Sequence, residues 1–322
     1  MAVKKIKLPN RLKALSTSLI MLWVLLACIP GLIALTVFFG WGTLINIIWL
    51  CIWALLFEAL VLVFRKRNLG FYLKDYSALV TAVLLGLCIP PSSPWWLSLT
   101  GIFFAIVIAK HLYGGLGQNL FNPAMVAYAV LLIAFPIEMT NWIIPLGLEQ
   151  DLDAYTGATA LDLFRNERAG MLISEFWSQN SAFGTLSGIG WEWVNGGFLL
   201  GGLLLLYKRI IGWQIPVAML TSLLLMSALF YDGGSSVSGG SPFMHLFGGG
   251  TMLGAFFIAT DPVTASTTPK GRLIYGTLIG IVTYIIRVWG AYPDGIAFAV
   301  LLGNFAAPFI DYYTQPKPSR NA

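Results

Sequence analysis

Residues 42–67 read GTLINIIWLCIWALLFEALVLVFRKR, an apolar run that closes on three consecutive basic side chains. A helix of about 20 apolar residues crosses the roughly 30 Å hydrocarbon core of a bilayer, and Lys and Arg collect at its cytoplasmic end. Positions 42–64 therefore predict a membrane-spanning helix, and Arg65-Lys66-Arg67 returns the chain to the cytoplasm. Inside the run lies one carboxylate, Glu58, where an ionisable group is costly and indicates a function by default.

The whole chain shares this apolar character. Of its 322 residues, 57% are hydrophobic and only 10% are charged, and the mean hydropathy is +0.79. Soluble domains average about 45–50% apolar and about 25% charged residues, so the composition predicts an integral membrane protein. The net charge of +5 does not indicate nucleic-acid binding, because the basic residues cluster at the ends of apolar runs. The three cysteines lie inside such runs, without the spacing of a metal site.

Nine further apolar segments predict an all-α polytopic protein of about ten transmembrane helices. Residues 1–16 carry five basic side chains and lead into the first span as an uncleaved signal anchor. Both termini are then expected in the cytoplasm, because the number of spans is even. The predicted spans are 19–39, 42–64, 77–89, 95–109, 124–135, 196–207, 215–231, 243–259, 273–289 and 296–310.

These spans divide the chain into three parts. Residues 1–135 form a first five-helix half, and residues 196–322 form a second. Between them, residues 136–195 hold eight of the fourteen acidic residues and only two basic ones, Arg165 and Arg168. That balance is typical of the extracytoplasmic face, so this part is predicted to be one extended outer loop.

The two halves are predicted to be inverted repeats. With five spans each, the second half enters the membrane in the opposite sense to the first. Pro90-Pro91-Ser92-Ser93-Pro94 follows the third span, and Thr260-Asp261-Pro262 follows the eighth, so helix breaks occupy corresponding places. Paired broken helices of this kind indicate an inverted repeat with a site at the repeat interface. Two unrelated helix breaks are the alternative.

The outer loop contains the heptad Asp153-Ala154-Tyr155-Thr156-Gly157-Ala158-Thr159. A Gly-Ala pair between two threonines lets a large group approach the backbone, and the last hydroxyl is a possible attachment point for a phosphate-bearing group. An ordinary turn is the alternative, because Asp, Thr and Gly are common loop residues.

Three stretches carry a resemblance to a known family: Gly114 to Ala124 (GGLGQNLFNPA), the heptad, and Phe256 to Thr264 (FFIATDPVT). Through them, essentially the whole chain resembles the RnfD/NqrB family. Its members are membrane subunits of the Rnf complex, the bacterial ion-translocating ferredoxin:NAD oxidoreductase, and more distantly of the sodium-translocating NADH:quinone reductase. The resemblance implies an electron-transfer subunit that couples electron flow to Na+ or H+ transport. It also implies that the A, B, C, E and G subunits of the Rnf complex are its partners, in the inner membrane of a bacterium.

The same resemblance implies FMN bound covalently through a phosphoester to a threonine. The family's attachment pattern is Asp, two residues, Ser or Thr, Gly, Ala, then the modified Ser or Thr. Asp153, Thr156, Gly157 and Ala158 match its fixed positions, so Thr159 is expected to take the flavin from a flavin transferase on the outer face. Nearby aromatic residues are candidates for stacking on the flavin ring, although anchoring at the membrane interface is equally open to them: Tyr155, Phe164, Phe176 and Trp177.

A second set of polar residues sits at helix ends and inside spans. These are candidates for an ion path or for a second, non-covalent flavin such as riboflavin, and capping of free backbone groups is the alternative for those at helix ends. For Glu58 the alternative is pairing with a neighbouring subunit or reaching toward the cytoplasm. His111 and His245 are isolated in the sequence, which gives a metal site little support. The candidates are Glu58, Asn119, Asn122, Asp261 and Thr264.

No motif here binds nicotinamide or an iron–sulfur cluster, so those steps are assigned to partner subunits. A channel or solute transporter of urea-channel-like fold, without a redox role, is the rival function. Ten spans with inverted broken helices also describe a permeation fold.

Overall fold

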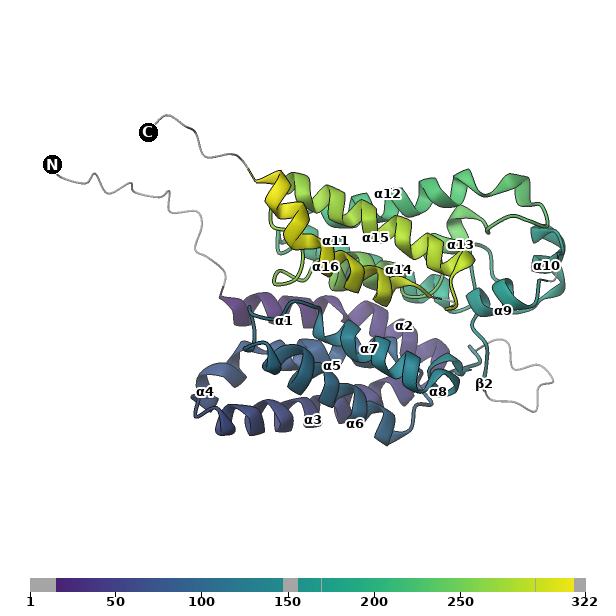
Figure 1. Cartoon of the computed structure of the whole chain (residues 1–322). Helices are drawn as coiled ribbons and strands as arrows, with labels where there is room; N and C mark the ends of the chain where they lie inside the picture. Colours follow the sequence, from purple (N-terminus) through teal and green to yellow (C-terminus); the bar gives the residue numbers. More distant parts are fainter. Residues whose placement is uncertain (1–15, 147–155, 169, 293, 316–322) are drawn as a thin grey trace, which may run out of the picture.

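The structure is a computed structural model that describes residues 16–146, 156–168, 170–292 and 294–315. Across these residues it is an all-α polytopic membrane protein, because regular structure is helical apart from one short pair of strands. Figure 1 shows two adjacent bundles of nearly parallel helices, the first from the N-terminal half of the chain and the second from the C-terminal half.

The first bundle holds the helices up to the outer segment. Two of its segments depart from the α-helix: η1 is a short 3-10 turn, and η2 is a nine-residue π-helix that continues α6. Its elements are α1 (Thr17–Ala27), α2 (Ile29–Phe39), α3 (Gly42–Phe64), α4 (Leu69–Tyr72), η1 (Leu73–Asp75), α5 (Ser77–Cys88), α6 (Trp95–Phe103), η2 (Phe104–Leu112) and α7 (Pro123–Ala134).

The second bundle and the segment before it complete the chain. A second π-helix, η4, ends the broken element of this bundle. The outer segment contains α8 (Pro136–Thr140), β1 (Trp142–Ile143), β2 (Thr156–Gly157), α9 (Ala160–Asn166) and α10 (Ile173–Gln179). The second bundle contains α11 (Trp191–Tyr207), α12 (Gln214–Leu229), η3 (Asp232–Gly234), α13 (Pro242–Phe247), α14 (Thr251–Leu253), η4 (Gly254–Ile258), α15 (Pro269–Trp289) and α16 (Ile296–Thr314).

Every predicted span contains helix, and the span at 243–259 is interrupted at 248–250. In the described part of the chain, five helical stretches are long and apolar enough to cross a bilayer, and the bent pair α4–η1 with α5 adds up to a sixth. Apolar helices α7 and α12 are shorter. The count of ten spans therefore stays a prediction. One boundary was wrong by about five residues, since α11 begins at Trp191 and not at 196.

The two bundles meet along corresponding helices. The first helical pair, α1 and α2, packs against α11, and α7 packs against α16. Small residues allow the close approach: a Cβ on Gly201 of α11 would collide with the carbonyl of Ala27, and one on Gly197 would collide with the carbonyl of Pro30. Substituting either glycine would force the bundles apart. Corresponding elements meeting across one interface is the arrangement that an inverted repeat predicts.

Both predicted helix breaks are present, and protein groups satisfy their backbones. After α5, the carbonyl oxygens of Pro90 and Pro91 accept hydrogen bonds from the Asn46 amide at 3.2 and 3.3 Å. After η4, at Thr260-Asp261-Pro262, the Thr260 hydroxyl donates to the Phe256 carbonyl at 2.7 Å, and the Asp261 carboxylate accepts from the Val263 N–H at 3.4 Å. A further break, between α13 and α14, is bonded by the Asn195 amide, which donates to the carbonyls of Phe247 and Gly249, both at 2.8 Å. Irregular backbone is tolerated at membrane depth where protein groups bond it in this way.

Three basic residues near the ends of predicted spans lie inside the bundles and not at a membrane surface. Lys110 and His111 belong to η2 and are buried, with 2% and 4% exposure, because the π-helix extends past the predicted end at residue 109. Arg287, near the predicted end of the span at 273–289, is 4% exposed within α15. These three side chains bond to partners inside the bundles, so their positions do not indicate which end of the protein faces the cytoplasm.

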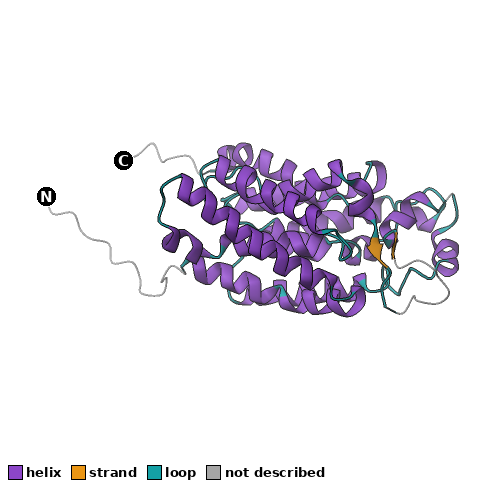
Figure 2. Cartoon of the chain, turned by 90° about the horizontal axis from the view of Figure 1, so that it is seen from below, coloured by secondary structure: helices purple, strands orange, loops and turns teal. Residues whose placement is uncertain are grey.

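The described part of the predicted outer loop contains short helices and one strand pair. Figure 2 shows the strand pair at the end of the bundle away from the start of α1. There β1 and β2 pair antiparallel, with Trp142 opposite Gly157. Helices α9 and α10 close over a small apolar core of their own that reaches α13: Ala160, Leu161, Phe164, Ile173, Phe176, Phe183 and Met244.

Candidate functional site

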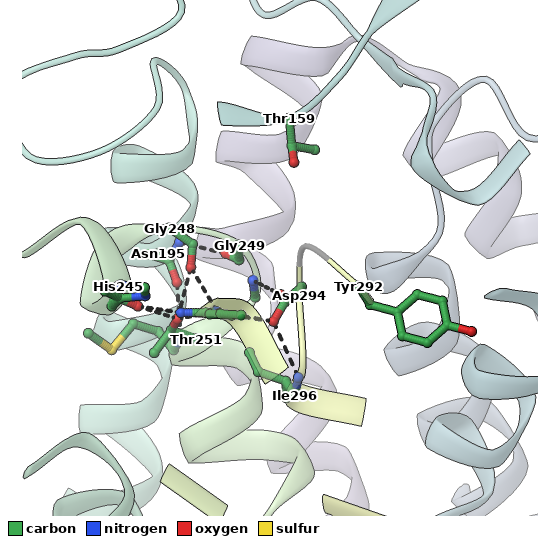
Figure 3. Close-up of polar contacts among 12 residues, drawn as sticks. Thr159, Asn195, His245, Gly248, Gly249, Thr251, Tyr292, Asp294 and Ile296 are labelled. Carbon is green, nitrogen blue, oxygen red and sulfur yellow. Dashed lines mark hydrogen bonds and ion pairs between the residues drawn. The ribbon is translucent and has the colours of Figure 1, made fainter. Parts of the chain in front are cut away.

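Thr159 stands at the junction of β2 and α9, where it is the N-cap residue of the helix. Its Oγ1 accepts a hydrogen bond from the Asp162 backbone N–H at 3.4 Å, and the side chain is half-buried. Partial burial raises the pKa of the neighbouring Asp162 carboxyl. Figure 3 shows the Thr159 hydroxyl directed toward the network around Gly249 and Asp294. The N-cap hydrogen bond thus orients the hydroxyl of the predicted acceptor at the edge of the interface between the two bundles.

A cavity opens beside Thr159 between the two bundles, and we call it the threonine cavity. Its lining is mostly apolar, with few polar side chains, as is typical of cofactor sites. Both bundles and the outer segment contribute to it. The lining residues are Leu87, Cys88, Met125, Tyr128, Leu132, Met139, Thr140, Trp142, Thr159, Leu161, Trp191, Gly249, Gly250, Leu253, Ile258, Asp294, Ile296 and Ala297.

An ion pair supports the polar wall of the threonine cavity (Figure 3). The Asp294 carboxylate accepts from the Gly250 N–H at 3.0 Å and pairs with Arg287 at 3.1 Å. Arg287 also donates to the His245 carbonyl at 2.7 Å and to Thr251 Oγ1 at 2.9 Å. The broken element from α13 to α14 is therefore fixed in place by charged hydrogen bonds, which are roughly twice as strong as neutral ones.

The aromatic residues of the threonine cavity are not the predicted ones. Trp142, Trp191 and Tyr128 line it, and the two indoles lie 4.8 Å apart, edge to face. Phe164 and Phe176 are instead buried in the core of the outer segment, with Trp177 packed against them, and Tyr155 lies outside the described residues. The sequence signal favoured aromatic residues near the heptad, and it could not reveal that strand pairing brings Trp142 to the site.

The fold places few constraints on the other residues of the motif. Thr156 and Gly157 form β2, Ala158 is exposed, and Asp153 lies outside the described residues. A Cβ on Gly157 would meet only Ile144 Cγ1 at 3.8 Å, an ordinary contact. The fold of this chain therefore does not require glycine there. A need for glycine at position 157 would come from the molecule that binds the motif.

A second cavity lies toward the other end of the interface, and we call it the asparagine cavity. Three of the candidate residues line it: Asn119, Asn122 and Asp261. It adjoins the threonine cavity, because Ala124 lines one and its neighbour Met125 the other. Its remaining lining is Ile20, Met21, Val24, Ser77, Val80, Thr81, Leu84, Lys110, Leu116, Pro123, Ala124, Leu205, Ile210, Ile211, Phe256, Phe257, Thr260 and Pro262.

Asn122 joins the two bundles at this cavity. Its side-chain oxygen caps α7 by accepting from the Ala124 N–H at 3.0 Å, and its own N–H donates to Asn304 Oδ1 of α16 at 3.0 Å. Asp261 accepts from the Thr264 hydroxyl at 2.9 Å. Asn122 therefore caps α7 and also lines the cavity, and its role in an ion path or in binding a second flavin stays a prediction.

Glu58 is buried behind the asparagine cavity, where it pairs within its own chain. Both carboxylate oxygens lie 2.8 Å from Lys110 Nζ, and His111 Nε2 lies 3.0 Å from Oε2. Lys110 Nζ also donates to Ser77 Oγ at 2.8 Å. His111, which is isolated in the sequence, thus contacts the Glu58 carboxylate, and Glu58 needs no neighbouring subunit to supply a partner. Lys110 and His111 are consecutive, and the π-helix that carries them places both on one carboxylate.

The chain is similar along nearly its whole length to proteins of one family. A family model described as the NQR2, RnfD, RnfE family matches residues 7–320. The D subunit of an ion-translocating oxidoreductase complex from Cellvibrio japonicus is 53% identical, covering 98% of this chain and 95% of that protein. A protein of the same name from Pseudomonas aeruginosa is 52% identical over 98% and 96%. Another, from Aliivibrio salmonicida, is 54% identical over 94% of each chain.

Proposed function

The chain belongs to the NQR2, RnfD, RnfE family, and from that premise we propose that it is the electron-transfer membrane subunit of an Rnf-type ion-translocating ferredoxin:NAD oxidoreductase, with FMN joined to Thr159. One observation supports the flavin most directly. The hydroxyl that the motif marks as acceptor lies on the wall of an apolar, aromatic cavity between the two bundles. A covalent bond to a residue on the wall of such a cavity suits a cofactor whose ring must stay inside the cavity.

The residues present fit an isoalloxazine ring. Trp142, Trp191 and Tyr128 offer aromatic surface, and Asp294 is held by Arg287 on the polar wall. When bound, FMN supplies one- or two-electron transfer, and the protein holds, orients and tunes it. In this proposal the chain's own groups exclude water from the ring and fix the charge beside it. The bond to phosphate leaves ring electronics to these surroundings.

We propose that the asparagine cavity holds the second flavin, and that riboflavin suits it better than a phosphorylated flavin. Of the described residues that line it, Lys110 alone is basic, and Glu58 already neutralises it. A phosphate group would therefore lack a partner cation there. Both cavities take lining residues from α7 and η4, so the two proposed flavins would contact the same two helical segments.

One experiment separates these assignments. Complex co-produced with its flavin transferase is denatured and fractionated. We expect a fluorescent band at the mass of this chain, a tryptic peptide carrying one FMN on Thr159, and a further flavin without phosphate in the released fraction. The absence of any covalent flavin from matured protein would overturn the redox proposal. FMN in place of riboflavin in the released fraction would contradict only the second assignment.

The proposed orientation places the Thr159 end of the bundle outside the cytoplasm, in the inner membrane of a bacterium. Ser178 is exposed in α10 at that end, and Lys270 is exposed at the start of α15. In intact cells stripped of any outer barrier, Ser178→Cys should react with an impermeant thiol reagent, whereas Lys270→Cys should react only after lysis. The reverse pattern would contradict the orientation. The native cysteines make a suitable background, because all three lie in helical segments of the bundle and none is exposed.

A further inference from the structure

A third cavity lies at the Thr159 end of the bundle, between α9, α13 and the end of α15. Unlike the two described above, its surface is mainly polar. We call it the arginine cavity, because three arginines reach it. Its lining residues are Leu161, Phe164, Arg165, Arg168, Gly170, Val237, Ser238, Gly239, Met244, His245, Arg287, Val288 and Trp289.

The arginine cavity carries a net positive charge. Residues 136–195 contain only two basic side chains among eight acidic ones, and both of them, Arg165 and Arg168, line this one cavity. None of its described lining residues is a carboxylate. Arg287 contributes little, because Asp294 pairs with it at 3.1 Å. Arg165 and Arg168, by contrast, form no salt bridge within the described part of the chain, so two guanidinium groups face a space that no described acid lines.

Arg168 is held in place while part of its guanidinium is left without a partner. Nη2 donates to the Ser236 carbonyl at 2.8 Å, and Cζ lies 4.6 Å from the centre of the Phe164 ring. Nη1 is buried and has no hydrogen-bond partner among the described residues. Burial lowers the pKa of this guanidinium, although it stays charged at any physiological pH. A buried donor on a cation is costly to leave unpaired, and an anionic oxygen would satisfy it.

The surface next to the arginine cavity is apolar and exposed. Val237 and Trp289, which line it, are 81% and 56% exposed. At the adjoining end of α12, Leu229 is 74% exposed, and Phe230 packs edge to face against Trp289 at 5.0 Å. Aromatic residues at the ends of apolar helices mark the boundary between lipid and water. The cationic groups thus sit at headgroup level beside a surface suited to acyl chains.

We propose that the arginine cavity binds the phosphate of an anionic phospholipid in the leaflet at the Thr159 end, with the acyl chains lying on α12 and α15. Arginine forms paired, charge-assisted hydrogen bonds with phosphate oxygens, and basic pockets between membrane helices recognise lipid headgroups. The bound lipid would contact both α9 and the α12–α15 pair at the surface of the protein. Of the described residues that line the arginine cavity, Leu161 also lines the threonine cavity, but none of its arginines lines a flavin cavity, so the proposal stands or falls independently of the flavins.

The test uses the whole purified complex, delipidated and titrated with phosphatidylglycerol, with bound lipids counted by native mass spectrometry. We expect one phosphatidylglycerol to bind with an affinity that falls about tenfold or more in Arg168→Gln, equivalent to roughly 1.4 kcal/mol or more. Arg165→Gln should show a smaller loss, because one of its nitrogens already donates to the Tyr292 carbonyl. Arg65→Gln removes an exposed charge at the opposite end and should change nothing.

Three controls decide among the alternatives. Arg168→Lys keeps the charge without the paired donors, so it should fall between wild type and Arg168→Gln. If inorganic phosphate binds with the same dependence on Arg168 and lipid shows no preference over it, the ligand is free phosphate and the lipid assignment is wrong. If lipid binding ignores Arg168 while Arg168→Gln releases a partner subunit, the cavity holds an acidic protein segment, and the proposal is equally overturned. The midpoint of thermal unfolding, measured on each variant complex and compared with wild type, confirms that the variant has folded.

Discussion

Thr159→Ala should yield a chain that inserts and assembles but carries no covalent flavin. The substitution removes the oxygen at which the motif predicts the phosphoester. It also removes the N-cap of α9, so we expect a cost of about 0.5–2 kcal/mol rather than the near-zero cost of an exposed loop position. That cost falls on a seven-residue helix at the edge of the bundle and should not prevent folding. In-gel fluorescence and the intact mass of the chain measure the result.

Two matched variants separate the chemistry from the cap. Thr159→Ser keeps both the oxygen and the cap, so it should retain at least some flavin. Thr159→Asn restores a capping side chain without a hydroxyl, so it should recover the stability and still carry none. Thr156→Ala tests the other threonine of the motif and should not move the attachment. FMN found on Thr156, or an unmodified Thr159 in matured protein, would contradict the assignment.

Much of the fold could be predicted because membrane helices are specified by local composition. The apolar run at 42–64 coincides with α3 at both ends, and the span predicted at 296–310 begins where α16 begins. The failures lie where polar residues continue a helix inside the protein. The composition of Trp191-Glu192-Trp193 is typical of a water-exposed segment before a membrane helix. Trp191 is nevertheless buried against Phe39 and already belongs to α11. Hydropathy alone carries no information about such partners.

The sequence predicted the acceptor residue of the candidate site but not the residues that line the cavity beside it. The heptad marked Thr159 from residues that lie next to it in sequence. Trp142 and Tyr128, by contrast, reach the threonine cavity through strand pairing and through α7, and nothing near the motif indicates them. The arginine cavity was hidden for the same reason. In the sequence its two arginines look like ordinary loop charges, and only the packing of α9 against α15 brings them beside Trp289.

The largest stability effect is expected at the buried ion pair of the first bundle. Glu58→Gln leaves the Lys110 ammonium, itself 2% exposed, without its anion. Breaking a buried pair by removing one partner costs about 3–5 kcal/mol, far more than the pair's net contribution when intact. We therefore expect a reduced yield of assembled complex and a lower midpoint of thermal unfolding. Glu167→Gln, at an exposed position after α9, should show neither change.

The double variant Glu58→Gln/Lys110→Met distinguishes a structural pair from an ion pathway. It removes both charges together, and replacing a buried pair by neutral groups is often neutral in stability, so folding and flavin content should recover. If Glu58 belongs to an ion pathway, as its cost inside the membrane suggests, ion transport per electron should stay low in this recovered complex. Sodium and proton uptake into proteoliposomes during electron transfer measures that ratio. Wild-type coupling in the double variant would show that the carboxylate serves only to neutralise Lys110, with Ser77 and His111 completing a structural cluster.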